Sequence, residues 1–240
     1  MRVLLIGGTD CSGGAGLARD IATAAGMGAE TCIAVTAVTA QTDARVTAVE
    51  MMPPALVAEQ IRAAGGVDAV KIGMLGSAPS VAAVARHLPD APLVLDPVLA
   101  SSSGRALLDG PGLGALIADL LPRTTLLTPN LPELRRLARH LGVGDEGDEA
   151  AAVRALLSRG CGAVLVKGGH AGPGPFCEDR LYLADGTIRR FSGPRHDIAL
   201  RGTGCQIASA IAVGIARTGD LRAAVHEARS LVMERFRNAV

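Results

Sequence analysis

The segment Arg201-Gly202-Thr203-Gly204-Cys205 has the composition of an anion site, because small residues directly precede an apolar helix expected at 206–217. The N–H groups of this segment and the positive end of the helix dipole would converge on one point. Cys205 would lie in the first helical turn, where we expect a lowered pKa and a thiolate able to take a proton from a substrate hydroxyl. The alternative is that Cys205 is only a small residue in a crowded turn.

The segment 128–133 places an amide, Asn130, and a carboxylate, Glu133, at the start of another expected helix. These two side chains would hold hydrated Mg²⁺ near the phosphates of ATP, since Mg²⁺ keeps several waters and takes few protein oxygens. Asp96 would assist from the end of a strand, and Lys167 would reach a phosphate as a point charge. The alternatives are that Glu133 only caps the helix and that Lys167 is only solvated.

A second glycine-rich segment, 7–16, joins an apolar strand to a helix and exposes N–H groups that can face an anion or a polar ligand. It is not a P-loop, because Gly8 and Gly13 are followed by Gly14 and Ala15 instead of Lys and Ser/Thr. It also lacks the spacing of a dinucleotide fingerprint. The alternative is a flexible turn between strand and helix.

Short apolar runs alternate along the chain with Ala/Leu/Arg-rich segments of helical period, which predicts strand-helix units in a parallel sheet. The expected strands are 3–6, 31–35, 69–72, 93–95, 125–127 and 163–166. The expected helices are 16–25, 55–64, 80–88, 113–121, 132–141, 149–159, 205–217 and 220–237. An Asp-Gly turn predicts a β-hairpin between 180–183 and 187–191.

The candidate residues follow the ends of these strands. Gly8 comes after the first strand, Asp96 after 93–95, Asn130 after 125–127 and Lys167 after 163–166. In a doubly wound sheet the ligand site lies beyond the carboxyl ends of the strands. The sequence therefore predicts that these residues gather at one edge of the sheet.

The bulk composition limits the range of partners. The chain has 240 residues, 49% of them hydrophobic, and a formal net charge of +1, so we expect one domain over 1–240 and no nucleic-acid partner. Its aromatic residues other than His are Tyr182, Phe176, Phe191 and Phe236, too few for a series of stacked bases. We therefore expect any bound ring to rest on aliphatic or Met side chains.

The cysteines and the hydropathy of the chain indicate where in the cell the protein is expected to be. The five cysteines are odd in number, scattered and without a C-x-x-C pair, which is typical of reduced thiols in a cytoplasmic protein. The apolar start is too short for a signal-peptide core, and the longest apolar run, 207–216, is too short to cross a bilayer. We expect no membrane association. The oligomeric state stays open, with a homodimer as one option.

Seven segments, in this order along the chain, resemble those of the hydroxymethylpyrimidine/phosphomethylpyrimidine kinase family. They are Gly7-Gly8-Thr9-Asp10-x-Ser12-Gly13-Gly14-Ala15-Gly16, Thr36-Ala37-x-x-Ala40-Gln41, Lys71-Ile72-Gly73-Met74-Leu75, Leu95-Asp96-Pro97-Val98, 128–133, Lys167-Gly168-Gly169-His170 and 202–205. The resemblance implies a ribokinase-like three-layer α/β fold, with a central, mostly parallel sheet flanked by helices. It also implies two successive ATP- and Mg²⁺-dependent phosphorylations of 4-amino-5-hydroxymethyl-2-methylpyrimidine in thiamine biosynthesis.

The resemblance also implies roles for individual residues. Cys205 would be the base, and Gly202, Thr203 and Gly204 would form the anion hole. The residues implied on the nucleotide side are Asp96, Asn130, Lys167 and Thr203, with Glu133 at the metal. The residues implied for the pyrimidine pocket are Gly8, Asp10, Gln41, Met74 and Val98. A carboxamide such as that of Gln41 is complementary to an aminopyrimidine edge.

The chain departs from the family pattern in several places. Ser101-Ser102-Ser103-Gly104 stands where the family usually has Lys, and Ala199-Leu200-Arg201 replaces Asn-Thr-His. Ala22 replaces a Lys of the first helix, and the family's Gly/His-rich tail is absent. Two other functions therefore stay open at this point: a pyridoxal kinase of the same superfamily, and a catalytically weak sensor that binds a pyrimidine.

Overall fold

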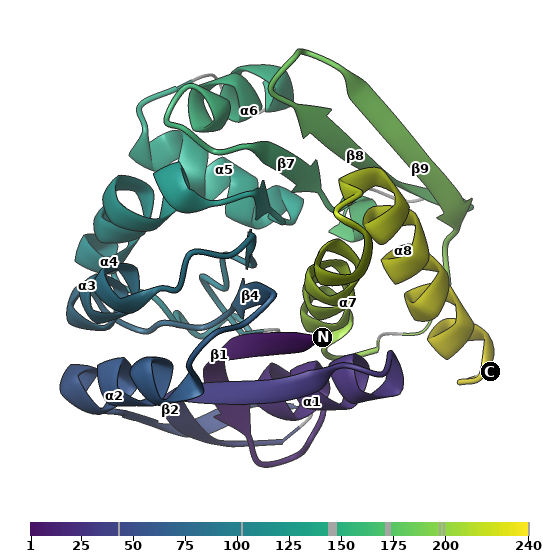
Figure 1. Ribbon diagram of the computed structural model, residues 1–240. Coiled ribbons are helices and arrows are strands. Elements are labelled where there is room, and N and C mark those ends of the chain that lie inside the picture. Colours follow the sequence, from purple (N-terminus) through teal and green to yellow (C-terminus); the bar gives the residue numbers. More distant parts are fainter. Residues whose placement is uncertain are drawn as a thin grey trace.

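The computed structural model describes residues 1–42, 44–101, 103–143, 148–170, 174–196, 198 and 200–239, and a nine-stranded sheet runs through its centre (Figure 1). Ser102 and Ala199, at two of the departures from the family pattern, lie outside the described residues. The strand order is β3-β2-β1-β4-β5-β6-β7-β8-β9. The parallel strands are β1 (Arg2–Asp10), β2 (Glu30–Gln41), β4 (Ala69–Ile72), β5 (Leu93–Leu95), β6 (Leu126–Leu127) and β7 (Ala163–Val166). The antiparallel strands at the two edges are β3 (Val46–Met51), β8 (Phe176–Leu183) and β9 (Ile188–Pro194).

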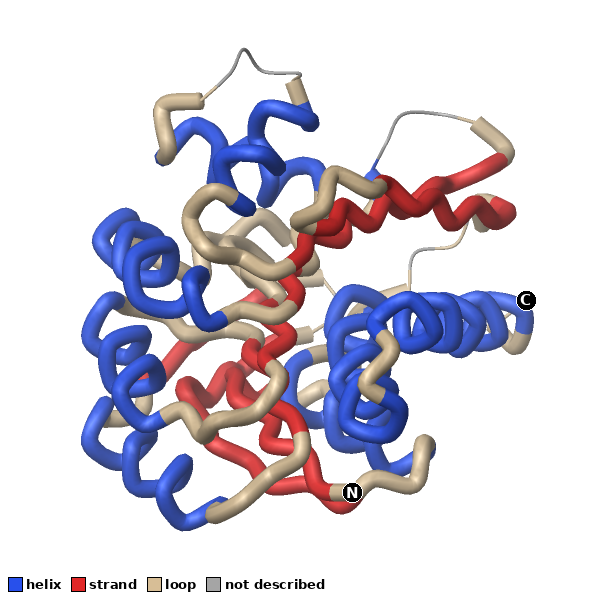
Figure 2. Tube along the Cα trace, turned by 45° about the horizontal axis from the view of Figure 1, so that its top comes forward, coloured by secondary structure: helices blue, strands red, loops and turns tan. Residues whose placement is uncertain are grey.

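Helices cover both faces of the sheet, which Figure 2 shows as a red layer between blue helices. One face carries α2 (Pro54–Ala64), α3 (Ala78–His87), α4 (Gly110–Ala115), α5 (Leu131–His140) and α6 (Glu149–Leu157). The other face carries α1 (Gly16–Gly26), α7 (Thr203–Thr218) and α8 (Leu221–Arg237). Side chains along a strand point alternately to opposite faces, so β1 contributes to the core on both sides of the sheet. Leu4 and Ile6 pack in the core on one face, and Val3 and Leu5 pack in the core on the other.

This arrangement confirms the predicted α/β fold with its mostly parallel central sheet. The expected helix 113–121 is wrong in its bounds: α4 begins at Gly110, because Asp109 caps it by accepting from the Gly112 N–H. A π-helical turn (Leu116–Leu120) and a 3-10 turn (Leu121–Arg123) then follow α4. A third short helix is the 3-10 turn Gly168–His170.

One edge strand was missed from the sequence. β3 is antiparallel to the far half of β2, which extends to Gln41 and not only to the predicted residue 35. Many side chains of β3 face solvent, so its pattern lacks the run of apolar residues that marks a strand buried on both faces.

The order in which strands are added to the sheet reverses at β1: β2 and β3 lie on one side of it, and β4 and the later strands lie on the other. Ligand sites of open α/β sheets lie at such a switch point. The register of β1 against β2 shifts between Gly7 and Gly8, and the Gly73 N–H donates to the Ile6 carbonyl at 2.8 Å. The end of β1 at Gly7 and Gly8 therefore lies beside Gly73, which directly follows β4.

Among the helices that the structure describes, none combines the length and the apolar character needed to span a bilayer. A single chain does not test the homodimer, which stays a prediction.

Candidate active site

One cavity of about 930 Å³ opens at the carboxyl ends of the parallel strands. It brings together all the predicted site residues except Asp10: Gly8, Gln41, Met74, Asp96, Val98, Asn130, Glu133, Lys167, Gly202, Thr203, Gly204 and Cys205. These residues come from loops that are up to two hundred positions apart in the chain. The prediction that the strand ends converge is therefore correct.

The predicted anion hole lies at the start of α7. Gly202 is the N-cap and has a φ of +72°, and a Cβ at this position would lie 2.3 Å from the Gly14 carbonyl oxygen. Only glycine fits here, on both steric and conformational grounds. A Cβ on Gly204 would lie 3.1 Å from Lys167 Nζ, so the lysine ammonium directly faces the hole.

Lys167 is held at that point by a buried ion pair. Its Nζ donates to Asp96 Oδ1 at 2.8 Å, and Thr128 Oγ1 donates to the same oxygen at 3.2 Å. Burial acts to lower the pKa of Lys167, but attraction to Asp96 and Glu133 outweighs it and raises the pKa. The side chain is therefore a fixed cation beside the anion hole.

Asn130 and Glu133 form a reciprocal capping box at the start of α5. The Glu133 N–H donates to Asn130 Oδ1 at 2.9 Å, and the Asn130 N–H donates to Glu133 Oε2 at 2.8 Å. Glu133 therefore does cap its helix, with Asn130 as its partner, and both residues also line the cavity. Burial raises the pKa of Glu133 to about 7, against the attraction of Lys167. The metal role stays a prediction.

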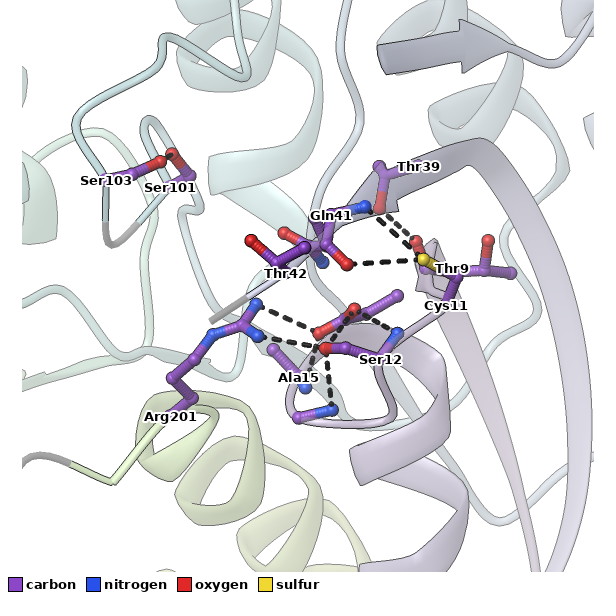
Figure 3. A network of polar contacts seen from close by, with 12 residues as sticks. Thr9, Cys11, Ser12, Ala15, Thr39, Gln41, Thr42, Ser101, Ser103 and Arg201 are labelled. Atoms are coloured by element: carbon purple, nitrogen blue, oxygen red, sulfur yellow. Dashed lines mark hydrogen bonds and ion pairs between the residues drawn. The ribbon is translucent and has the colours of Figure 1, made fainter. Parts of the chain in front are cut away.

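Another part of the cavity lining is apolar. A Cβ on Gly8 would lie 3.0 Å from Met74 Sδ, so the glycine lets the thioether approach the strand, and Val98 completes the apolar lining. The backbone of Gln41 is held by Cys11, whose Sγ accepts from the Gln41 N–H at 3.3 Å (Figure 3). No hydrogen bond to the Gln41 carboxamide occurs within the described residues, so that group is available to a ligand.

Asp10 does not line the cavity, and its carboxylate is fully buried. Oδ1 accepts from the Ser12 N–H at 2.9 Å and from Ser12 Oγ at 2.7 Å, and Oδ2 accepts from the Ala15 N–H at 2.9 Å. Asp10 therefore organises the glycine-rich loop in this structure, and its expected contact with the substrate stays a prediction.

Comparison with known proteins agrees with this geometry. The family model described as phosphomethylpyrimidine kinase matches residues 10–240. Hydroxymethylpyrimidine/phosphomethylpyrimidine kinase from Rhizobium meliloti is 38% identical over 95% of this chain and 87% of its own length. The enzyme of that name from Mycobacterium bovis is 41% identical over 99% of this chain and 89% of its own.

The chain belongs to the phosphomethylpyrimidine kinase family. Solved structures agree with that assignment. Phosphomethylpyrimidine kinase from Clostridium difficile has a TM-score of 0.80 and 30% identity, covering 98% of this chain and 99% of its own. Pyridoxal kinase from Staphylococcus aureus, in complex with AMP-PCP and pyridoxal, has a TM-score of 0.84 and 26% identity over 97% of this chain and 86% of its own. The predicted family, ribokinase-like fold and phosphotransferase class are confirmed.

The expected thiolate character of Cys205 in this kinase is wrong for the ligand-free protein. Burial raises the pKa of Cys205 to about 11, and the attraction of Lys71 offsets only part of that effect. The nearby carboxylates of Asp20 and Asp96 raise it further. The position in the first turn of α7 is as predicted, but desolvation and the negative neighbours decide the direction of the pKa shift.

A buried polar cluster at the floor of the kinase cavity was missed. Lys71 Nζ donates to Asp20 Oδ2 at 2.6 Å, and Ser209 Oγ donates to Asp20 Oδ1 at 2.7 Å. These three residues join β4, α1 and α7. A lysine inside the apolar strand Ala69–Ile72 was a usable signal, because a fully buried charge needs a partner.

The part of the cavity beside α8 was not predicted from the sequence. His196 and Phe236 stack there with ring centroids 4.9 Å apart, next to Val232 and Met233 of α8. Aromatic rings therefore line part of the cavity, and the expectation that a bound ring rests on aliphatic or Met side chains stays a prediction. Neighbouring Asp179 accepts from the Gly168 N–H at 2.7 Å and pairs with Arg229, which fixes the loop after Lys167.

Proposed function

We propose that this kinase transfers the γ-phosphoryl group of ATP to the hydroxymethyl oxygen of 4-amino-5-hydroxymethyl-2-methylpyrimidine, and then to the resulting monophosphate. The observation that carries the proposal is the single cavity that joins a ring pocket at Gly8, Gln41 and Met74 to a phosphate end at Gly202 and Lys167. The names of the relatives agree with it.

The phosphate end supplies what phosphoryl transfer requires. The charge of the transferred group is spread over its equatorial oxygens, so catalysis depends on positioned donors and cations. The N–H groups at the start of α7 would donate to those oxygens, and Lys167 would neutralise charge from the adjacent side. Asp96 keeps the ammonium in place through a hydrogen bond of 2.8 Å.

The donor set fits a magnesium ion bound with ATP. Glu133 is a partly buried carboxylate whose pKa is raised to about 7, so a nearby divalent cation would favour its charged form. Glu133 would hold the hydrated ion, while Asn130 and Thr203 would contact the nucleotide phosphates. Bound Mg²⁺ would screen the phosphate charges.

Cys205 is the proposed base. The free protein holds it mainly as the thiol, because burial raises its pKa to about 11. A loose phosphoryl-transfer transition state lets the hydroxyl proton leave late, which lowers the demand on the base. Lys71 favours the thiolate, so proton acceptance by Cys205 depends on that buried cation.

The test is a product assay on the purified full chain. Mg·ATP would be mixed separately with hydroxymethylpyrimidine, its monophosphate and pyridoxal, and both ADP and the phosphorylated product would be measured. We expect phosphorylated pyrimidine from the first two. Tight pyrimidine binding without product would favour a sensor and contradict the proposal.

Pyridoxal kinase activity is the second candidate, and the structural likeness to the Staphylococcus aureus enzyme supports it. Both substrates carry a hydroxymethyl group on a six-membered ring. Efficient turnover of pyridoxal, with slow turnover of the pyrimidine, would replace the proposal by this alternative.

A further inference from the structure

Arg201 joins the two glycine-rich loops of the active site (Figure 3). Its Nη1 donates to Ser12 Oγ at 2.9 Å, and its Nη2 donates to Asp10 Oδ2 at 3.1 Å. The Ser12 hydroxyl in turn donates to Asp10 Oδ1 at 2.7 Å, so each of the three side chains contacts the other two. Arg201 directly precedes the anion hole, whereas Asp10 is the last residue of β1 and Ser12 lies in the loop that follows.

The backbones of the two loops also touch where the guanidinium bridges them. A Cβ on Gly202 would lie 2.3 Å from the Gly14 oxygen, and a Cβ on Gly14 would lie 3.1 Å from Arg201 Nη1. Any outward shift of the first loop would therefore remove the support of Gly202, where the anion hole begins. Ala15 and Gly16 of the same loop line the cavity.

The main chain of Arg201 is held from the other side by α8. Arg235 Nη2 donates to the Arg201 carbonyl at 2.9 Å, and Arg235 Nη1 donates to Gln206 Oε1 at 3.2 Å. The backbone of Arg201 is thus anchored to α7 and α8, while its side chain reaches across to the first loop. A shift of the glycine-rich loop after β1 would therefore also shift the residues at the start of α7.

We infer that Arg201 is a positioning residue that clamps loop 10–16 onto the start of α7 and keeps the anion hole aligned with the ring pocket. This inference rests on the proposed function. A guanidinium presents parallel N–H groups that fit two neighbouring acceptors. The clamp is therefore a property of the arginine in this chain.

The clamp is tested with Arg201→Met, Ser12→Ala and the double variant, measured for kcat and KM with Mg·ATP and hydroxymethylpyrimidine. We expect Arg201→Met to lower kcat by about 10- to 100-fold, since misplaced catalytic groups cause losses of that order, with a KM change of less than about threefold. The double variant should lose no more than Arg201→Met alone, because both changes break one set of contacts. Losses that multiply, or an unchanged kcat, would overturn the inference.

Hydrogen exchange of the ligand-free protein gives a readout that does not depend on activity. Amides of residues 12–16 should exchange faster in Arg201→Met than in the wild type, and Arg201→Lys should restore only part of the protection. Unchanged exchange in this segment would also overturn the clamp. If the wild type fails to phosphorylate the pyrimidine, the proposed function fails while the exchange result still decides on the clamp.

Arg180→Met is the matched control. Arg180 has the same side-chain exposure as Arg201, 17%, and its ion pair with Glu149 lies outside the cavity. This variant should lower the melting temperature and leave kcat and the exchange of residues 12–16 unchanged. If it reproduced the kcat loss of Arg201→Met, general destabilisation would explain both variants. If Arg201→Met does not fold, Arg201→Lys replaces it in the kinetic comparison.

Discussion

The ammonium of Lys71 and the carboxylate of Asp20 form an ion pair, with 2.6 Å between Nζ and Oδ2, and each side chain is only 1% exposed. Burial acts to lower the pKa of Lys71, but the charge and hydrogen bond of Asp20, together with the attraction of Cys205 and Asp96, outweigh it and raise the pKa, so the lysine stays charged. The pair joins α1 to β4, and it also reaches α7, because Asp20 accepts from Ser209 of that helix.

Lys71→Met should lower the free energy of unfolding by about 3–5 kcal/mol, since it leaves Asp20 buried without its counter-charge. Adding Asp20→Asn should recover at least about 1 kcal/mol, because the amide oxygen still accepts from Ser209 and no charge is left alone. Urea denaturation followed by circular dichroism measures both. A double variant less stable than Lys71→Met would contradict this account of the pair.

Cys205→Ala should lower kcat for the first phosphorylation by about 10²–10⁴-fold, with little change in KM, because a base acts mainly in the transition state. Steady-state kinetics with hydroxymethylpyrimidine measure this. Cys161→Ala is a control, since that thiol is buried in the core and does not line the cavity. A Cys205→Ala enzyme with near wild-type kcat would remove the assignment of the base.

The raised pKa of Cys205 predicts a pH-dependent reactivity. Because the thiolate is the reactive form and the pKa is about 11, alkylation by iodoacetamide should be slow at pH 8 and should accelerate as the pH rises. Exposed Cys11 is the internal reference. Mass spectrometry of the labelled peptides resolves the two sites. Faster labelling of Cys205 than of Cys11 at pH 7 would show that the pKa is lowered instead.

Glu133→Gln should raise the Mg²⁺ concentration needed for half-maximal activity, because it removes a charge next to the proposed metal and keeps the shape of the side chain. Glutamine can still accept from the Asn130 N–H, so the capping box should persist. Mg²⁺ titrations at saturating ATP measure the effect, with thermal melting as the stability readout. An unchanged titration together with reduced stability would leave Glu133 only the capping role.

Gln41→Leu should lower kcat/KM for the pyrimidine, with a loss of transition-state stabilisation of about 1–3 kcal/mol. The reason is that the polar edge of the ligand would lose its partner inside an apolar pocket. Pyridoxal, whose polar groups are arranged differently, should lose less. Parallel kinetics on both substrates measure the difference. Equal losses would indicate that the pocket discriminates by shape through Met74 and Val98, without a specific contact to Gln41.

The class of fold and the meeting of the site residues were predictable from the sequence because both follow from periodicity. Apolar runs such as Ala69–Ile72 and Ala163–Val166 mark strands buried on both faces, and parallel strands place their carboxyl ends at one edge. Gly8, Asp96 and Lys167 then meet in one cavity whatever their separation in the chain. Local spacing also offered a capping role for Glu133, which the capping box with Asn130 bears out.

Only the tertiary structure decided which partners these residues have and in which protonation state they rest. The pKa of Cys205 depends on burial and on Lys71, Asp20 and Asp96, none of which is near it in the chain. Arg201 reaches Asp10 across 191 positions. Desolvation and Coulomb energies vary with distances in space, which strand periodicity does not encode, so the charges of the site follow from the folded arrangement.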